Sequence, residues 1–191
     1  MRIESNCLIL AKLNDTMENQ EDKHTIGGLG ESADFSQDDA RFMQRAIDIS
    51  VENVDTGGGP FGAVIVKDGK IITTGANRVV PDNDPTAHAE VNAIRSACRK
   101  LNTFKLEGCT IYSSCEPCPM CLSAIYWAGI SRLCYGNTKD DAKAIKFDDS
   151  FIYDQLALDY SERSLKCDHF MRTQALEAFI KWDNKNDKTR Y

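Results

Sequence analysis

The 191-residue sequence lacks any apolar stretch that approaches the ~20 residues needed to span a membrane. Its first apolar run, residues 7–10, is followed closely by Lys12 and by no small-residue cleavage pattern, so we expect no secretory signal. Internal repeats and low-complexity tracts are also lacking. These absences, with a length that suits one domain, favour a cytoplasmic globular protein without a membrane partner.

Positive charge is also scarce. Lysine and arginine number 23 against 29 acidic residues, which gives a formal net charge of −6 and a pI of about 5.1. Proteins that bind duplexes or long RNA usually present a basic face, so nucleic acid is an unfavoured partner and a small-molecule substrate is favoured. The eight cysteines do not predict disulfides, because three of them cluster within residues 115–121.

Metal-binding residue types are concentrated between Pro85 and Cys121. His88-Ala89-Glu90 is followed by Pro117-Cys118-Pro119-Met120-Cys121. His-x-Glu followed by Pro-Cys-x-x-Cys is a known signature of zinc-dependent nucleobase deaminases. The two motifs occur together and in the expected order, which favours a catalytic zinc site.

The chemistry of these groups supports that interpretation. On a helix, Cys118 and Cys121 share one face, and a helix N-terminus lowers the pKa of a thiol there. With His88 they make three ligands, which leaves the fourth tetrahedral position of Zn²⁺ open to water, as in catalytic sites. Two thiolates cancel the formal charge of the metal, so a neighbouring base becomes useful, and we expect Glu90 to be that base.

Three other interpretations compete with catalytic zinc. Cys115, Cys118 and Cys121 resemble the start of an iron–sulfur motif, but Ile125 stands where a further cysteine is needed. A structural four-cysteine site would have to recruit Cys109 at an unsuitable spacing and would leave the histidine unused. Lastly, the histidine and thiols could be ordinary helix-start and core residues.

Periodicity and turn residues predict one sheet flanked by helices. We expect a helix capped by Ser36 and ending at Gly57-Gly58-Gly59, then a hairpin of strands 61–67 and 70–78, then a helix capped by Thr86. A strand at 110–114, the cysteine-bearing helix to about residue 128, a strand at 132–135 and helices near 140–144, 150–156 and 171–182 complete the domain. Residues 1–35 have no sustained period, so we expect a poorly ordered extension before a catalytic domain of residues 36–191.

From about residue 36 onward the sequence resembles the zinc-dependent guanine deaminases of the cytidine deaminase-like superfamily. The stretches that carry the resemblance are Gly58–Gly69, Asn83–Val91, Ser114–Cys121, Ala124–Ala128 and Phe147–Tyr153. The first three are shared with tRNA adenosine deaminases, and the last two narrow the choice. The resemblance implies a three-layer α-β-α fold around a mixed five-stranded sheet.

The resemblance also implies roles for individual residues. His88, Cys118 and Cys121 would bind zinc, with Glu90 as proton shuttle and Asp149 assisting near the departing amino group. The implied substrate contacts are Asn77, Phe61, Ala87, Trp127 and Tyr191. Tyr191 would act across a homodimer whose subunits exchange C-terminal segments, and a long extension before residue 36 is a departure from the family.

Guanine is not the only substrate that this pattern fits. Guanosine deaminases share much of the motif set, and a tRNA adenosine deaminase is a further alternative that the acidic balance disfavours. A protein of another class, a catalytically silent zinc-binding partner subunit, would have no need of the Glu90 carboxylate. Hydrolytic deamination of guanine is therefore our prediction.

Overall fold

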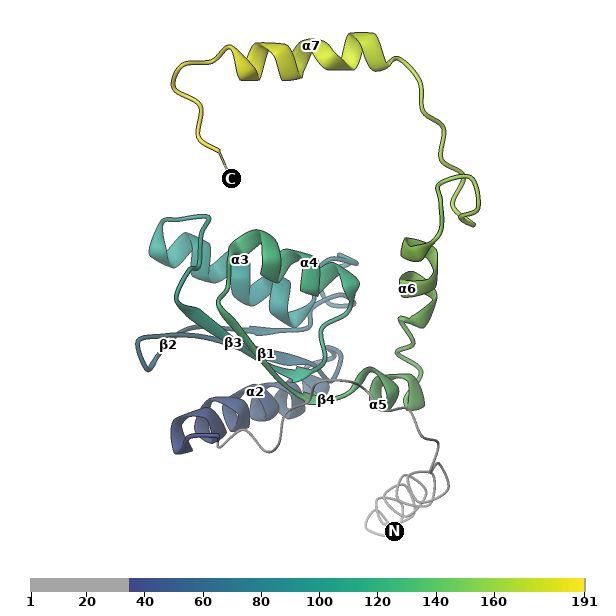
Figure 1. Cartoon of the computed structure of the whole chain (residues 1–191). Coiled ribbons are helices and arrows are strands. Elements are labelled where there is room, and N and C mark those ends of the chain that lie inside the picture. Colours follow the sequence, from purple (N-terminus) through teal and green to yellow (C-terminus); the bar gives the residue numbers. More distant parts are fainter. Residues whose placement is uncertain (1–34, 191) are drawn as a thin grey trace. The chain divides into compact units, whose positions relative to one another are not determined.

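The computed structural model describes residues 35–190. Their helices and strands follow one another in the order expected from the sequence (Figure 1). The elements are α2 (Gln37–Asp55), β1 (Gly62–Lys67), β2 (Lys70–Ala76), α3 (Ala89–Leu101), β3 (Cys109–Cys115), α4 (Pro119–Ala128), β4 (Arg132–Asn137), α5 (Lys139–Ala144), α6 (Ser150–Ala157) and α7 (Arg172–Asp183). The expected extension lies almost wholly outside the described residues, so that boundary stays a prediction. No helix within residues 35–190 is long and apolar enough to cross a membrane.

Four strands form one mixed sheet in the order β2-β1-β3-β4. Strand β1 runs antiparallel to β2 and β3, whereas β3 and β4 are parallel. The β1–β2 hairpin turns at Asp68 and Gly69, whose φ angles of 50° and 70° suit a tight two-residue turn.

The fifth strand expected from the resemblance is a wrong prediction for the described residues, which contain four. After β4 the chain forms α5 and α6, and the segment 158–171 that leads to α7 contains no strand. The apolar side chains of that segment are exposed in the single chain, with Tyr160 at 69%, Leu165 at 73% and Phe170 at 76%, so the segment does not pack against the sheet.

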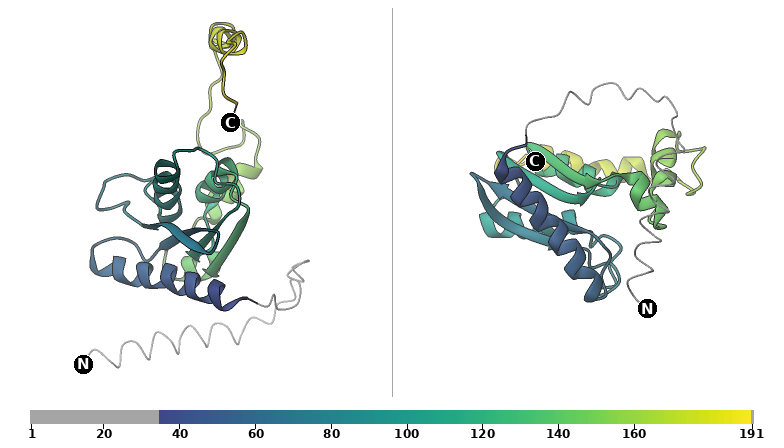
Figure 2. Two further views of the ribbon diagram at one scale, coloured as in Figure 1. Left: turned by 90° about the vertical axis from the view of Figure 1, so that its left-hand side faces the viewer. Right: turned by 90° about the horizontal axis from the view of Figure 1, so that it is seen from below.

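Helix α2 covers one face of the sheet and helices α3 and α4 cover the other, so the predicted three-layer arrangement is confirmed (Figures 1 and 2). Successive side chains of β1 point to opposite faces of the sheet, so this one strand packs against both helix layers. Ala63 and Ile65 belong to the apolar cluster under α3 and α4, and Val64 and Val66 belong to the cluster under α2. Every second residue of a strand therefore faces the same layer.

The N-terminus of α2 is fastened to the sheet by Asp39. Ser36 caps the helix and forms a capping box with Asp39, as expected of a good N-cap residue. The carboxylate of Asp39 also accepts hydrogen bonds from the Tyr112 hydroxyl at 2.5 Å and from Arg132 at 2.7 Å. These two bonds, Tyr112 first, hold the pKa of Asp39 well below its usual range, so the charged form ties α2 to β3 and β4.

The start of α3 differs from the expectation and places His88. The helix begins at Ala89, with His88 as N-cap residue in extended backbone (φ −69°, ψ 156°), so the Thr86 cap is a wrong prediction. Thr86 is held instead by Asp84, whose Oδ1 accepts hydrogen bonds from its amide at 2.8 Å and its hydroxyl at 2.7 Å. Gly75 lets α3 approach β2, because a Cβ there would lie 2.1 Å from the Ala89 carbonyl oxygen.

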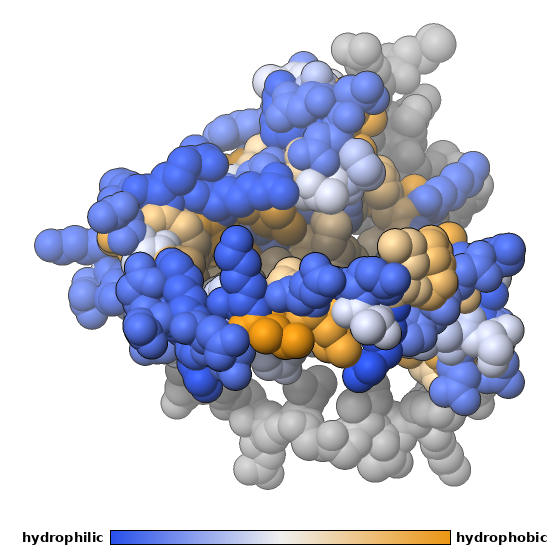
Figure 3. All heavy atoms as spheres, turned by 90° about the horizontal axis from the view of Figure 1, so that it is seen from above, coloured by the Kyte–Doolittle hydropathy of each residue, from blue (hydrophilic) through white to orange (hydrophobic). Residues whose placement is uncertain are grey.

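Helices α5, α6 and α7 contain no buried residue in the described chain. Their exposed apolar side chains include Phe151 at 59%, Phe179 at 72% and Ile180 at 59%. Apolar side chains also lie open among hydrophilic ones on the face shown in Figure 3. The predicted helix near residues 171–182 is confirmed as α7, but its apolar side is not covered within one chain.

Candidate metal and catalytic site

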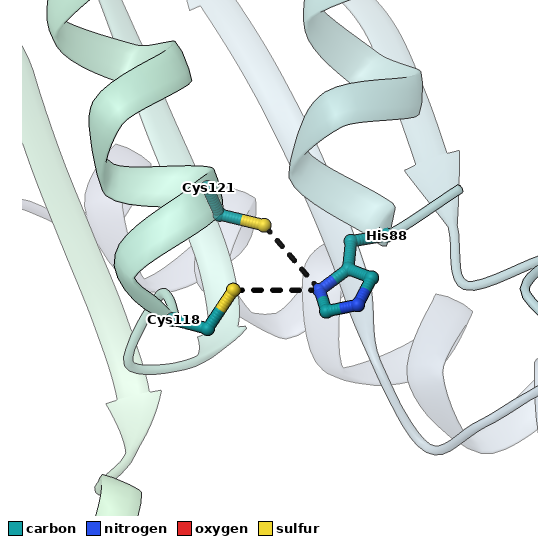
Figure 4. A group of neighbouring side chains, drawn as sticks. All are labelled: His88, Cys118 and Cys121. Carbon is teal, nitrogen blue, oxygen red and sulfur yellow. Dashed lines mark hydrogen bonds between the residues drawn. The ribbon is translucent and has the colours of Figure 1, made fainter. Parts of the chain in front are cut away.

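Three side chains from two helix N-termini converge on one point (Figure 4). His88 is the N-cap residue of α3, Cys118 is the N-cap residue of α4, and Cys121 lies in the first turn of α4 after Pro119. The Nδ1 atom of His88 lies 3.6 Å from the sulfur of Cys118 and 3.5 Å from that of Cys121. The predicted ligand residues are therefore brought together, although their occupation by a metal stays a prediction.

The separations of these atoms fit a tetrahedral zinc ion. Zn–N bonds of about 2.0 Å and Zn–S bonds of about 2.3 Å at a tetrahedral angle place nitrogen and sulfur about 3.5 Å apart. The observed 3.5 and 3.6 Å match that requirement. Within residues 35–190 this is the one group of three or more histidine, cysteine and acidic side chains whose ligand atoms all lie within 4.8 Å of one another. Two sulfurs and one imidazole nitrogen are a donor set that zinc favours.

Electrostatics at the helix starts prepares the ligands for a cation. A hydrogen bond from the Cys121 thiol, and then one from His88, lower the pKa of Cys118 to about 4. The pKa of His88 is raised, chiefly by the same contact with Cys118. The hydrogen bond to Cys118 and burial raise the pKa of Cys121, which still carries its proton in that pair. A bound metal removes such a proton, because the thiolate is the ligand.

The other cysteines named in the competing interpretations do not join this group. Cys115 is buried, its thiol lies 3.6 Å from the Thr138 carbonyl oxygen, and burial raises its pKa to about 11. Cys109 is fully buried in the apolar cluster under α3 and α4. Neither the iron–sulfur interpretation nor a four-cysteine zinc site is supported by this arrangement.

Glu90 stands beside the ligand trio without belonging to it. Only 6% of the residue is exposed, and burial raises the pKa of its carboxyl group. The Ser113 hydroxyl donates a hydrogen bond to Oε1 at 3.0 Å, and the Cys121 sulfur lies 3.4 Å from Oε2. A buried carboxyl group with a raised pKa, next to a metal-binding group, suits general acid–base chemistry.

A cavity of about 530 Å³ opens next to His88, Glu90 and Cys118. Two larger hollows lie along α2 and α7, but neither is lined by a histidine or cysteine. The volume lies within the range of roughly 300–1,000 Å³ that small-molecule pockets occupy. Asn77, Phe61 and Asp149 also line this cavity, so three further predicted residues meet the metal-binding group.

Each of these three residues presents a group to the cavity. Asn77 is 7% exposed; its Oδ1 accepts a hydrogen bond from the Val79 amide, and its Nδ2 has no partner among residues 35–190. Phe61 meets Phe147 edge to face with ring centroids 5.1 Å apart. Asp149 makes no side-chain capping bond to α6, and burial raises its pKa.

Asp148 makes the local side-chain hydrogen bonds at the start of α6. Its Oδ1 accepts hydrogen bonds from the Ser150 amide at 3.0 Å and from the Ser150 hydroxyl at 2.6 Å. From sequence we expect Asp148 to cap this helix, but Asp149 is the N-cap residue, and Asp148 instead bonds to the residue two positions on. The neighbouring carboxyl group of Asp149 is thereby left available to the cavity.

Three residues predicted to contact the substrate are not placed in the cavity. Ala87 is buried, and its carbonyl oxygen accepts hydrogen bonds from the Arg78 amide at 2.8 Å and from Asn92 at 3.2 Å. Trp127, near the end of α4, is 66% exposed and lines a separate surface hollow. Tyr191 lies outside the described residues. Contacts of these residues with substrate stay predictions.

Two buried polar residues near the site, Ser113 and Asn53, are not predicted from the sequence. Ser113, on β3, is the donor to Glu90 described above. Asn53, on the buried side of α2, donates to the carbonyl oxygens of Gly59 at 2.8 Å and Asn77 at 2.7 Å and so joins two parts of the cavity wall. A Cβ on Gly58 would lie 2.2 Å from the Asn53 amide nitrogen, so only glycine fits there. The one available signal is a polar residue in an otherwise apolar pattern.

The fold and the ligand trio agree with a comparison to known families. Residues 36–137 match the family described as the cytidine and deoxycytidylate deaminase zinc-binding region, and the chain belongs to this family. Of the site residues predicted from sequence that the structure describes, only Asp149 lies outside the matched range. The family resemblance predicted from sequence is confirmed.

Individual relatives narrow the comparison. The guanine deaminase of Bacillus subtilis is 49% identical over 151 residues, which cover 78% of this chain and 97% of that protein. A crystal structure of guanine deaminase from that organism matches with a TM-score of 0.78 at 48% identity and covers 80% of this chain and 98% of the other. A tRNA-specific adenosine deaminase of Aquifex aeolicus is 44% identical over 94 residues, which cover 49% of this chain and 62% of that protein.

Proposed function

We propose that this protein hydrolyses guanine to xanthine and ammonia in purine metabolism, with zinc held by His88, Cys118 and Cys121. The observation that carries the proposal is the buried Glu90 carboxyl group beside a three-ligand metal site, at a cavity that Asn77 and Asp149 also line. The similarity to the Bacillus subtilis guanine deaminase extends over nearly the whole of that enzyme and supports guanine as the substrate.

In this proposal the protein side chains move the protons. A zinc ion at the trio supplies a Lewis acid that acidifies water and stabilises developing negative charge. Glu90 would take one proton from the attacking water and deliver it to the ring nitrogen, and would then carry the second proton, from the added hydroxyl group, to the leaving amino group. Water adds to the amino-bearing carbon, the carbon–nitrogen bond breaks, and ammonia leaves, so one water is consumed per guanine.

The remaining cavity residues would hold the purine in position. The Asn77 amide nitrogen has no partner among the described residues and can donate to an acceptor on the ring. Phe61 offers an aromatic surface beside it. Asp149, whose pKa is raised by burial, would assist proton transfer near the amino group that departs. Fixing the ring presents one carbon to the attacking water.

A substrate panel tests the proposed function. Ammonia release by the zinc-loaded protein is measured with guanine, guanosine, adenine, cytosine, cytidine and tRNA at equal concentrations. We expect guanine to give the highest kcat/KM by at least about tenfold, since a site that pairs buried polar groups with one base rejects other bases. Guanosine or tRNA as the preferred substrate would overturn the guanine assignment. No ammonia release from any of the six would favour a zinc-binding partner subunit without catalytic activity.

We also propose a homodimer whose subunits exchange C-terminal segments. The support is that α6 and α7 bury no residue in the single chain and expose Phe151, Phe179 and Ile180. Apolar faces left uncovered in one chain suit burial by a second copy. Tyr191 would then lie near the active site of the partner subunit and exclude water from it.

Deletion of residues 188–191 tests the role of the tail. We expect zinc content and Tm to stay nearly unchanged, because the described tail contacts of Lys188 are to Asp183 and Trp182 of the neighbouring helix. We expect kcat/KM for guanine to fall by about tenfold or more, since a wetter site weakens the electrostatic interactions in it. Steady-state kinetics with elemental analysis measures both quantities.

Mixing two chains of lowered activity tests whether the tail acts across the dimer. A tail-deleted chain combined with a Glu90→Gln chain should regain activity, because a heterodimer then holds one site with both Glu90 and a borrowed tail. Full activity of the deleted protein alone would remove the water-excluding role. Confirmed heterodimers that stay inactive would remove the exchange between subunits.

A further inference from the structure

Ser113 occupies an unusual place for a polar side chain. It lies in β3 with 1% of its surface exposed, on the same side of the strand as Ile111, which packs under α3 and α4. Its hydroxyl donates a hydrogen bond to Oε1 of Glu90 at 3.0 Å. That oxygen is the only hydrogen-bond partner of the hydroxyl among residues 35–190. A buried hydroxyl group must find a partner, and Glu90 meets that need.

The two carboxyl oxygens of Glu90 have different neighbours. Oε1 receives the Ser113 hydroxyl, whereas Oε2 faces the ligand trio and lies 3.4 Å from the Cys121 sulfur. A cysteine that ligates a metal does so as a thiolate and has no proton left to donate. Among the described side chains, Ser113 is then the remaining hydrogen-bond donor to Glu90.

We propose that Ser113 is a positioning residue of the active site that holds Oε1 of Glu90 and thereby keeps Oε2 directed at the metal-binding group. This inference rests on the proposed function, because it concerns the side chain that moves the proton. A base must stay within hydrogen-bonding reach of the proton that it takes, and a displacement of about 1 Å can cost about 10²-fold in rate. The Ser113 bond fixes one oxygen from the sheet side, so the other stays in place.

The adjacent Ser114 provides a matched control. It is also in β3 and is 3% exposed, but it points to the opposite face of the sheet. Its hydroxyl oxygen accepts a hydrogen bond from the Gly62 amide at 3.0 Å. Replacing either serine by alanine therefore removes one buried hydroxyl group and one hydrogen bond, and only the Ser113 variant touches Glu90.

Steady-state kinetics of Ser113→Ala, Ser114→Ala and Ser113→Thr with guanine tests the inference. We expect Ser113→Ala to lower kcat by about 10- to 100-fold with KM within about threefold and with zinc retained. Ser113→Thr, which keeps the hydroxyl group, should regain most of kcat, and Ser114→Ala should keep it within about threefold. Equal losses in the two alanine variants, or full kcat in Ser113→Ala, would overturn the positioning role.

A second measurement separates action through Glu90 from a general packing effect. In a Glu90→Gln background, where no proton can be taken, adding Ser113→Ala should change the residual kcat by less than about twofold. The full Ser113→Ala loss in that background would contradict the inference. If wild-type protein releases no ammonia from guanine, both the proposed function and this inference are wrong. If the wild type is active and Ser113→Ala keeps its full kcat, only the positioning role of Ser113 is wrong.

Thermal unfolding gives a readout that does not depend on turnover. Ser113→Ala should lower Tm when Glu90 is present, because a buried carboxyl oxygen loses its donor. In a Glu90→Leu background the same change should leave Tm unchanged or raise it, since the hydroxyl group then has no partner to lose. The same decrease of Tm in both backgrounds would contradict the pairing. Should Ser113→Ala not fold, Ser113→Cys, with a similar volume and a weak donor, replaces it in both tests.

Discussion

Glu90→Gln should lower kcat for guanine by at least about 10²-fold, the smallest effect expected when a positioned acid–base group is lost. Glutamine has nearly the same shape and can still accept the Ser113 hydrogen bond on its oxygen. It cannot take a proton from water. Since Glu90 is not one of the three ligands, zinc content should stay at one per chain and Tm close to that of the wild type.

Measurement of this variant needs a control for the change of glutamate to glutamine as such. Glu52→Gln provides it, because Glu52 lies on the exposed side of α2 in an ion pair with Arg45 at 3.1 Å. Surface pairs of this kind contribute little, so both kcat and Tm should barely change. Near-normal turnover in Glu90→Gln, with zinc bound, would remove the proton-shuttle role.

Cys118→Ala should lose zinc, and turnover should fall by more than the roughly 10- to 100-fold that loss of an outer-shell partner alone costs in a metal site. Cys118 is the ligand whose pKa is lowered to about 4 by Cys121 and then by His88, so it meets a cation as a thiolate. Removing it leaves two protein ligands, too few to hold zinc tightly.

Cys115→Ala is the matched control for Cys118→Ala. Cys115 lies three residues away and is also buried, but its thiol contacts the Thr138 carbonyl oxygen and lies outside the ligand trio. It should therefore keep its zinc and measurable turnover. Elemental analysis of both purified proteins checks this expectation. Full zinc in Cys118→Ala with zinc lost in Cys115→Ala would show that the ligands are assigned wrongly.

The parts of the site that follow from sequence are those written in local spacing. His88, Glu90, Cys118 and Cys121 lie at the starts of α3 and α4, where a helix brings residues three apart onto one face. The N-cap at Ser36 and the turn at Asp68-Gly69 are local as well, and both expectations are confirmed. Short-range geometry is nearly independent of the rest of the chain.

Contacts between distant segments do not follow from spacing. Ser113 meets Glu90 across 23 residues and Asn53 meets the Asn77 carbonyl oxygen across 24, and both depend on how α2, α3 and β3 pack. Threonine favours a cap position, which is why the sequence predicts a cap at Thr86, but Asp84 competes for its amide. The fifth strand rests on resemblance alone, without a period-two pattern in the sequence to support it.

Helix α7 shows a different limit. Its apolar residues indicate a helix that buries one face, yet Phe179 is 72% and Ile180 59% exposed in the single chain. An amphipathic pattern predicts that a face is covered without naming the partner that covers it. The exposure of Trp127 at 66% raises the same question for α4.

Hydrolytic deamination places one oxygen atom from water on the ring carbon that the amino group leaves. Zinc-loaded protein is incubated with guanine in water enriched in ¹⁸O, and the product is analysed by mass spectrometry beside a Glu90→Gln reaction. We expect xanthine carrying one solvent-derived oxygen, ammonia in equal amount, and almost none of either with Glu90→Gln. Xanthine without the heavy oxygen, or no xanthine from the zinc-loaded wild type, would contradict it.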